Sequence, residues 1–296
     1  MTTASALASA ERYTRCAHAC AAGVIRGYST SFAMATRLLP PTVRRDISSV
    51  YALVRVADEV VDGAAEGAGL DLDRAGARLD ALEADVARAT EEGFSENMVV
   101  HAFADVARRT GIPGDVVTPF FTSMRTDLTR SVHDDASFTE YVYGSAEVVG
   151  LMCLHAFFGD AGLPVAHREQ LVTGARRLGA AFQKVNFLRD LDADADALER
   201  AYFPGVDPAR LDEPTKQRLV RDIDDDLAAA AEAIPLLPRG VRPAVQVAHD
   251  LFAALNRRIR NTGADVVRSS RIRVPDTTKV AIAARAMARH RWGRRS

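Results

Sequence analysis

Two pairs of aspartates, each pair separated by four residues, are the side chains in this sequence whose type and spacing could do chemistry. Asp58 and Asp62 lie in the segment VYALVRVADEVVD, and Asp190 and Asp194 lie in FQKVNFLRDLDADAD. Residues four apart share one face of a helix, where two carboxylates repel each other unless a positive charge lies between them. Oxygen ligands suit Mg²⁺, which leaves coordination positions for a substrate phosphate. The two pairs therefore predict a magnesium-dependent site that binds a diphosphate.

Each aspartate pair continues a narrow polar stripe along a helix that is otherwise apolar. At about 100° per residue, Tyr51 and Arg55 share a sector with the first pair, and Gln183 and Asn186 share one with the second, beside Arg189. A buried carboxylate needs a cation, an ion pair or a water-filled cavity beside it. We expect the two arginines to complete a clamp that stabilises diphosphate as an allylic C–O bond ionises. The alternative is that they are structural ion-pair partners of the aspartates.

The sequence contains no pattern that is typical of other kinds of functional site. Cys16, His18 and Cys20 are too close together on one short stretch for the usual zinc spacing. The chain has no glycine-rich phosphate loop, and its three cysteines predict a reduced cytosolic protein. Three histidines without a partner pattern are interpreted as structural: His101, His133 and His155.

Length and composition describe an ordinary globular protein without a charge bias. The chain has 296 residues, of which 48% are hydrophobic, and a net charge of −1 at pH 7. Such a charge gives no field that attracts nucleic acid, so no nucleic-acid partner is expected. The N-terminus has no signal-peptide pattern, and no run of about 18 apolar residues suggests a membrane span. A cytoplasmic protein is therefore expected.

Helical periodicity recurs along the chain, whereas strand alternation does not. Proline and glycine mark the turns, and no linker divides the sequence. Residues 1–296 are therefore predicted to form a single all-α domain, a helical bundle that encloses a central cavity lined by inward-facing carboxylates. Helices are expected at residues 6–25, 41–63, 71–91, 96–110, 114–130, 137–159, 164–196, 212–233, 241–262 and 276–290.

Residues 276–296 form a basic C-terminal segment with five arginines after residue 280 and no acid after Asp276. One interpretation is peripheral contact with an anionic membrane surface, the inner face of the plasma membrane, which would suit substrates with long lipid tails. The other is a solvated tail with a disordered end.

Four segments in order resemble the squalene/phytoene synthase family, the head-to-head prenyl diphosphate synthases, and bacterial phytoene synthases in particular. They cover nearly the whole chain, and four ordered matches are far more specific than one aspartate pair. The fold implied is that of an isoprenoid synthase. The segments are YSTSFAMATRLLPPTVRRDISSVYALVRVADEVVD, YVYGSAEVVGLM, LGAAFQKVNFLRDLDADADALERAYFP and RIRVPDTTKVAIAARAM.

The resemblance implies a role for each residue that matches a family motif. Mg²⁺, or Mn²⁺ in its place, would be held by Asp58, Asp62, Asp190 and Asp194. Diphosphate or its metals would be bound by Arg55, Arg189, Gln183 and Asn186, the two arginines acting with the aspartates in catalysis. The pocket or the diphosphate would be contacted by Ser29, Ser31, Tyr51, Tyr141, Tyr202 and Arg271.

The chain departs from the family's pattern at several positions. Tyr28 and Thr30 stand where the family has a histidine and a basic residue. Glu147 replaces a usual glycine, and Lys184 replaces a usual small polar residue. The spacing that precedes Tyr202 is slightly longer than usual.

The family's chemistry joins two identical prenyl diphosphates. One ionises to an allylic cation, the double bond of the second attacks it, and proton loss to diphosphate or a tyrosine gives a cyclopropyl diphosphate that rearranges to a linear hydrocarbon. The first expectation is phytoene from two geranylgeranyl diphosphates in carotenoid biosynthesis, handed over to a downstream desaturase. One alternative is squalene or dehydrosqualene from two farnesyl diphosphates, with NADPH required for squalene alone. The other is a non-catalytic helical scaffold or assembly partner.

Overall fold

The computed structural model describes residues 3–29, 34–191 and 201–292 of the chain. These residues are helices joined by short turns and contain no β-strand, only an isolated bridge between Val132 and Ala201. The all-α prediction is confirmed. The chain divides into two compact units, so the single domain and its central cavity stay predictions. The first unit is Met1–Leu128 with Met152–Pro164, and the second unit is Thr129–Leu151 with Val165–Ser296.

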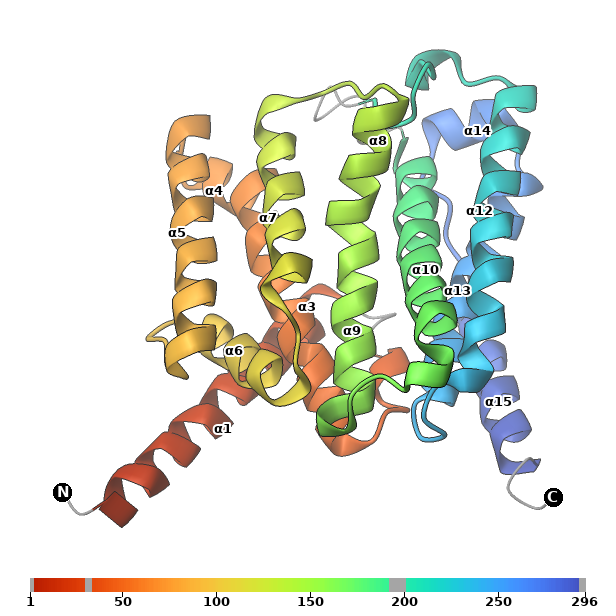
Figure 1. The fold of residues 1–296 in the computed structure, drawn as a ribbon. Coiled ribbons are helices and arrows are strands. Elements are labelled where there is room, and N and C mark those ends of the chain that lie inside the picture. The colour runs from red at the N-terminus through yellow and green to blue at the C-terminus, as the bar shows by residue number, and fades with distance from the viewer. Residues whose placement is uncertain (1–2, 30–33, 192–200, 293–296) are drawn as a thin grey trace. The chain divides into compact units, whose positions relative to one another are not determined.

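The first unit is built around α3, which packs against α1 and α6. Small side chains at Ala17, Ala21, Ala52 and Ala102 form the core where these three helices meet, and they let the backbones approach closely. Figure 1 shows these helices in red, orange and yellow. The helices that begin in the first unit are α1 (Thr3–Tyr28), α3 (Pro41–Asp62), α4 (Ala64–Gly67), α5 (Leu72–Glu92), α6 (Met98–Thr110) and α7 (Gly114–Thr129).

A buried polar network fixes α1 and α6 against α3. The His18 ring lies 2.9 Å from Ser49 Oγ through Nδ1 and 2.9 Å from Asp105 Oδ2 through Nε2. Arg109 donates to Asp105 and, at 2.8 Å, to Asp46 Oδ1. Burial alone would raise the pKa of Asp105, but the hydrogen bond from His18 and the charge of Arg109 lower it to about 2. The network holds α3 in a fixed position and so positions the polar stripe on its other face.

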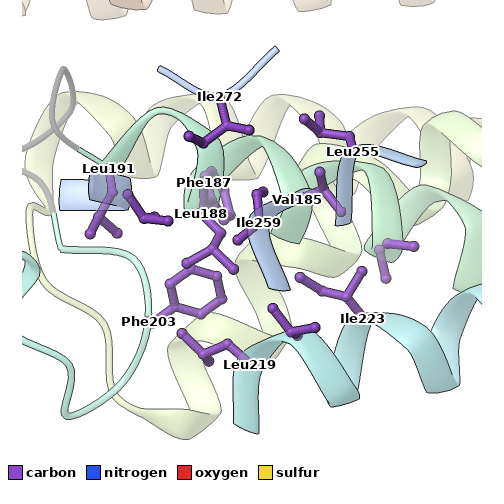
Figure 2. Close-up of a cluster of buried hydrophobic side chains, with 14 of the residues drawn as sticks. Val185, Phe187, Leu188, Leu191, Phe203, Leu219, Ile223, Leu255, Ile259 and Ile272 are labelled. Carbon is purple, nitrogen blue, oxygen red and sulfur yellow. The ribbon is translucent and has the colours of Figure 1, made fainter. Parts of the chain in front are cut away.

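The second unit is centred on α10, which packs against α12 and α13. A π-helical turn, Tyr143–Glu147, joins α8 to α9. Figure 2 shows apolar side chains of α10, α12 and α13 meeting in one core cluster, among them Val185, Ile223 and Ile259. The remaining helices are α8 (Asp135–Val142), α9 (Val148–Phe158), α10 (Arg168–Arg189), α12 (Glu213–Ala233), α13 (Arg242–Arg260), α14 (Ala264–Ser269) and α15 (Asp276–Trp292).

Most expected helices match an observed one within a few residues, but the helix expected at 164–196 is interrupted at Asp190; Leu191 is helical again, and residues 192–196 lie outside the described residues. The helix α10 ends at Arg189, and Asp190 is its C-cap, with φ −100° and ψ 14°. The N–H of Asp190 still donates to the Asn186 carbonyl at 2.9 Å. No glycine or proline marks this end, so the sequence carried none of the usual stop signals.

One helical stretch, Asp135–Ala161, is long and apolar enough to cross a membrane by length and composition. Its most apolar window has a mean hydropathy of 1.3, and 44% of that window is buried inside the protein. The stretch is not an unbroken apolar run, and it meets the criterion because a mean hydropathy tolerates glycine and polar residues among apolar ones. A core helix of a soluble protein meets the same criterion.

The contact of α10 with the π-helical turn depends on glycine. A Cβ at Gly179 would overlap the Ala146 carbonyl oxygen and lie 2.9 Å from its carbonyl carbon. Because both partners are backbone, we expect Gly179→Ala to lower the free energy of unfolding by roughly 1–3 kcal/mol. Gly76→Ala on α5 is the matched control: its nearest neighbour is Leu128 Cδ1 at 3.8 Å, so helix propensity should leave that variant equally or more stable. Urea denaturation measures both, and equal stabilities would contradict the close contact.

Candidate functional site

The first aspartate pair lies on α3 as predicted. This helix begins at Pro41, whose fixed φ suits a first helical position, and continues unbroken to Asp62. Its buried face holds Ser49, Val50, Ala52, Leu53 and Ala57. The predicted stripe of Tyr51, Arg55, Asp58 and Asp62 follows the other side, where the first three are partly buried and Asp62 is exposed.

Asp58 is an acidic group whose charge the described residues compensate only in part. Among the described residues we find no hydrogen bond or ion pair to its carboxylate. Burial and the negative charge of Asp62, one turn along, raise its pKa to about 7, against which the charge of Arg55 acts only in part. Near neutral pH this carboxyl therefore holds a proton about half of the time, and a cation beside it would displace that proton.

Arg55 is not paired with the predicted aspartates. Its Nη2 donates to Glu59 Oε1 one turn further along α3, and its Cζ lies 4.3 Å from the centre of the Tyr28 ring. Its Nε is buried, and no described residue accepts a hydrogen bond from it. The ion-pair alternative named the aspartates, whereas Arg55 is paired with Glu59, a partner that the i, i+4 spacing of the two residues could have revealed.

The C-terminal end of α1 contacts the same stripe. The side chains of Ser29 and Tyr51 are hydrogen-bonded, and burial raises the pKa of the Tyr51 hydroxyl. This contact places Ser29 beside Tyr51 on the stripe, and its role in the pocket or at the diphosphate stays a prediction. Ser31 lies outside the described residues.

Asp190, at the end of α10, is held by two arginines. Arg189 donates to both of its carboxylate oxygens, with Nε 2.9 Å from Oδ1, and Arg271 Nε lies 2.8 Å from Oδ1. The structural role left open for Arg189 is therefore present here, and Arg271 shares it. Asp194 lies outside the described residues.

The amides expected on α10 lie along the turns that precede Asp190. Gln183 and Asn186 are partly buried there. The Asn186 Oδ1 is buried, and no described residue donates to it. Such an orphan acceptor is costly in a protein interior unless a bound cation, donor or water satisfies it.

Tyr141 and Tyr202 belong to an aromatic cluster that includes His133. The Tyr202 ring is stacked 3.9 Å from that of Phe187, and the two tyrosine rings are 5.6 Å apart. His133 is buried, with its ring 4.9 Å from that of Tyr141. Sequence reasoning grouped the tyrosines by resemblance and interpreted His133 as structural, but no spacing rule connected it to them.

Two departures from the family's pattern have structural partners. Lys184 Nζ lies 2.6 Å from Asp222 Oδ2 and 2.8 Å from Asp226 Oδ2, which ties α10 to α12. Glu147 accepts from Arg176 Nε at 2.6 Å. Both residues therefore serve helix packing within the second unit.

The described residues contain no group of three or more His, Cys, Asp or Glu side chains that could hold a metal ion. The first pair supplies two carboxylates, of which Asp58 is unneutralised, and hard oxygen ligands of this kind fit Mg²⁺ or Mn²⁺. Asp190 could ligate a cation only after its two arginines release it. That all four aspartates coordinate the metal ions stays a prediction.

Comparisons with known proteins agree with the fold and the motifs. The sequence model of squalene/phytoene synthases matches residues 25–278. The 15-cis-phytoene synthase of Paracoccus sp. is 31% identical over 271 residues, which cover 86% of this chain and 85% of the relative. The chloroplastic phytoene synthase 3 of Zea mays is 33% identical over 197 residues, 65% of this chain but only 42% of the longer plant protein.

Solved structures share the arrangement of helices. A dehydrosqualene synthase structure, at 20% identity, aligns with a TM-score of 0.75 over 94% of this chain and 98% of that chain. A squalene synthase from Alicyclobacillus acidocaldarius, also at 20% identity, aligns with a TM-score of 0.71 over 84% of this chain and 94% of its own. These likenesses identify the fold.

Proposed function

Because the chain belongs to the squalene/phytoene synthase family, we propose that it joins two molecules of geranylgeranyl diphosphate head to head into phytoene, a step of carotenoid biosynthesis. It is a prenyltransferase, and prenyl diphosphates are its substrate class. The observation that supports phytoene as the product is the likeness to a bacterial 15-cis-phytoene synthase over 86% of the chain.

We propose Mg²⁺, with Mn²⁺ as a substitute, as the ion that the first aspartate pair holds. The absence of a described partner for Asp58 and its raised pKa support this assignment. When bound, the cation would offset the negative charge that develops on the departing diphosphate. Without it, Asp58 and Asp62 would repel an anionic substrate.

The arginines and amides of the site are proposed to bind diphosphate directly. Arg55 presents a buried Nε–H with no described acceptor, and a diphosphate oxygen would satisfy it with a charge-assisted hydrogen bond. Arg189 and Arg271 hold Asp190 in the free protein, and a substrate diphosphate would compete for their donors. Asn186 offers its orphan amide oxygen to a cation or a donor.

The pKa of Asp58 makes a pH-dependent prediction for cation binding. Because that pKa lies at about 7, protons compete with Mg²⁺ below it, and affinity should rise about tenfold per pH unit up to neutrality and then level off. Calorimetric titration with Mg²⁺ in two buffers of different ionisation enthalpy measures both the affinity and the proton released. An affinity that does not change between about pH 5.5 and pH 8 would contradict the raised pKa.

The product assay decides the substrate. The purified protein is incubated with Mg²⁺ and either geranylgeranyl or farnesyl diphosphate, with and without NADPH, and the extracted hydrocarbons are analysed by mass. We expect phytoene from the longer substrate without NADPH. A hydrocarbon formed only from farnesyl diphosphate would move the assignment to squalene or dehydrosqualene. A folded protein that forms no product would favour the scaffold, which should keep partner binding in the Asp58→Asn, Asp190→Asn double variant.

We further propose a cytoplasmic location with peripheral contact to the inner face of the plasma membrane through residues 276–296, and handover of the hydrocarbon to a downstream desaturase. The basic charge of this segment and the apolar product support both. Co-sedimentation with anionic vesicles, compared with neutral ones, tests the membrane contact, and equal sedimentation would contradict it.

A further inference from the structure

Tyr28 is the last residue of α1, and its ring faces a guanidinium of the functional stripe. The Cζ of Arg55 lies 4.3 Å from the ring centre, well inside the range of cation–π attraction. On its other side Arg55 is held by Glu59. The aromatic ring and the carboxylate thus restrain the same guanidinium from α1 and from α3.

A second contact fixes Tyr28 over this guanidinium. Ser29 follows Tyr28 directly, and its side chain is hydrogen-bonded to Tyr51, which precedes Arg55 by one turn of α3. The last residue of α1 and the residue that follows it therefore meet two residues that are four apart on α3. The contact between Ser29 and Tyr51 fixes the backbone next to Tyr28 and so keeps its ring within reach of Arg55.

We propose that Tyr28 is a positioning residue for diphosphate binding: its ring holds the Arg55 guanidinium in place so that its Nε–H, for which no described residue is an acceptor, can donate to a diphosphate oxygen. This inference rests on the proposed function and extends it. A free arginine side chain loses rotamer entropy when it binds a ligand. A ring that already restrains the guanidinium removes part of that cost before the substrate arrives.

Tyrosine suits this role better than the histidine that the family's pattern has at this position. A protonated histidine would repel Arg55, whereas the phenol ring attracts a guanidinium through its face and carries no positive charge. The ring, rather than the hydroxyl, is the part of Tyr28 that contacts Arg55. Removing the ring should therefore weaken diphosphate binding, whereas removing the hydroxyl alone should not.

The test measures binding of inorganic diphosphate in the presence of Mg²⁺ by titration calorimetry. Tyr28→Leu and Tyr28→Gln should weaken binding by about 3- to 30-fold, the range that corresponds to loss of a cation–π contact, while Tyr28→Phe should bind within about twofold of the wild type. The matched control is Tyr143→Leu, which removes the ring 5.1 Å from Arg176 Cζ in the second unit and should leave binding unchanged. Because Tyr28 is 54% exposed, thermal unfolding of its variants without ligand should match the wild type.

A double-mutant cycle shows whether Tyr28 acts through Arg55. In an Arg55→Lys background, which loses the planar guanidinium, Tyr28→Leu should weaken binding by less than about twofold. An equal loss in both backgrounds, or wild-type affinity in Tyr28→Leu and Tyr28→Gln, would overturn the positioning role while leaving the proposed function intact. Failure of the wild type itself to bind diphosphate with Mg²⁺ would instead overturn the proposed function.

Discussion

Replacement of Asp58 by asparagine should lower hydrocarbon formation by on the order of 10²- to 10³-fold and, without a cation, should stabilise the fold. Both effects come from the carboxylate of Asp58, which would bind the cation and destabilises the fold when no cation is present. Burial and Asp62 raise the pKa of Asp58 to about 7 from its ordinary 3.8. The folded state therefore binds this proton more tightly than the unfolded state does. Stability is lost as pH rises from about 4 to about 7, by up to about 4 kcal/mol.

Asparagine has the shape of aspartate but no charge to desolvate, so it removes this cost. At about pH 8 the cation-free variant should unfold at a higher temperature than the wild type, and at about pH 4 the two should agree. Mg²⁺ should stabilise the wild type and not the variant. Asp225→Asn, on an exposed position of α12, is the control and should change neither turnover nor stability. A variant that is inactive but less stable at pH 8 would contradict the unpaired state of Asp58.

Asp190→Asn should reduce turnover by a similar factor, on the order of 10²- to 10³-fold, but should destabilise the cation-free fold. Arg189 and Arg271 both donate to this carboxylate. Without it, two guanidiniums remain close together with a neutral acceptor between them. We expect the free energy of unfolding to fall by about 1–2 kcal/mol, since these ion pairs are only partly buried and solvent screens the charges.

Chemical denaturation without divalent cations measures this loss, and 1 M salt should reduce it by screening. A second change tests the cause. Arg271→Gln in the Asp190→Asn background should recover part of the lost stability, because it removes one of the two cations. A further loss of stability in the double variant would show that Arg271 does not depend on Asp190.

The contrast between these two aspartates could not be read from the sequence. Both occur in the same spacing motif, but Asp58 lies inside α3, whereas Asp190 is the C-cap of α10. The difference comes from Arg189, the neighbour of Asp190 in the chain, and from Arg271, which is 81 residues away. Contacts at that separation leave no periodic signal.

The sequence was sufficient for features that depend on local periodicity. The helices α3, α5 and α12 and the stripe from Tyr51 to Asp62 follow from apolar residues at helical spacing. The hydrogen-bonded role of His18 did not follow, since it joins three helices through side chains distant in sequence. The π-helical turn at Tyr143–Glu147 was missed because its composition resembles that of the flanking α-helices.

The central claim, that this chain joins two prenyl diphosphates, is tested most directly with mixed isotopes. The enzyme is given Mg²⁺ and an equal mixture of unlabelled and fully deuterated geranylgeranyl diphosphate, and the extracted product is analysed by mass. Joining two molecules predicts a hydrocarbon in three mass classes, the mixed class twice as abundant as each of the others. Products in only two classes, each with the carbon skeleton of a single substrate, would mean that the enzyme only removes diphosphate, and would contradict the account.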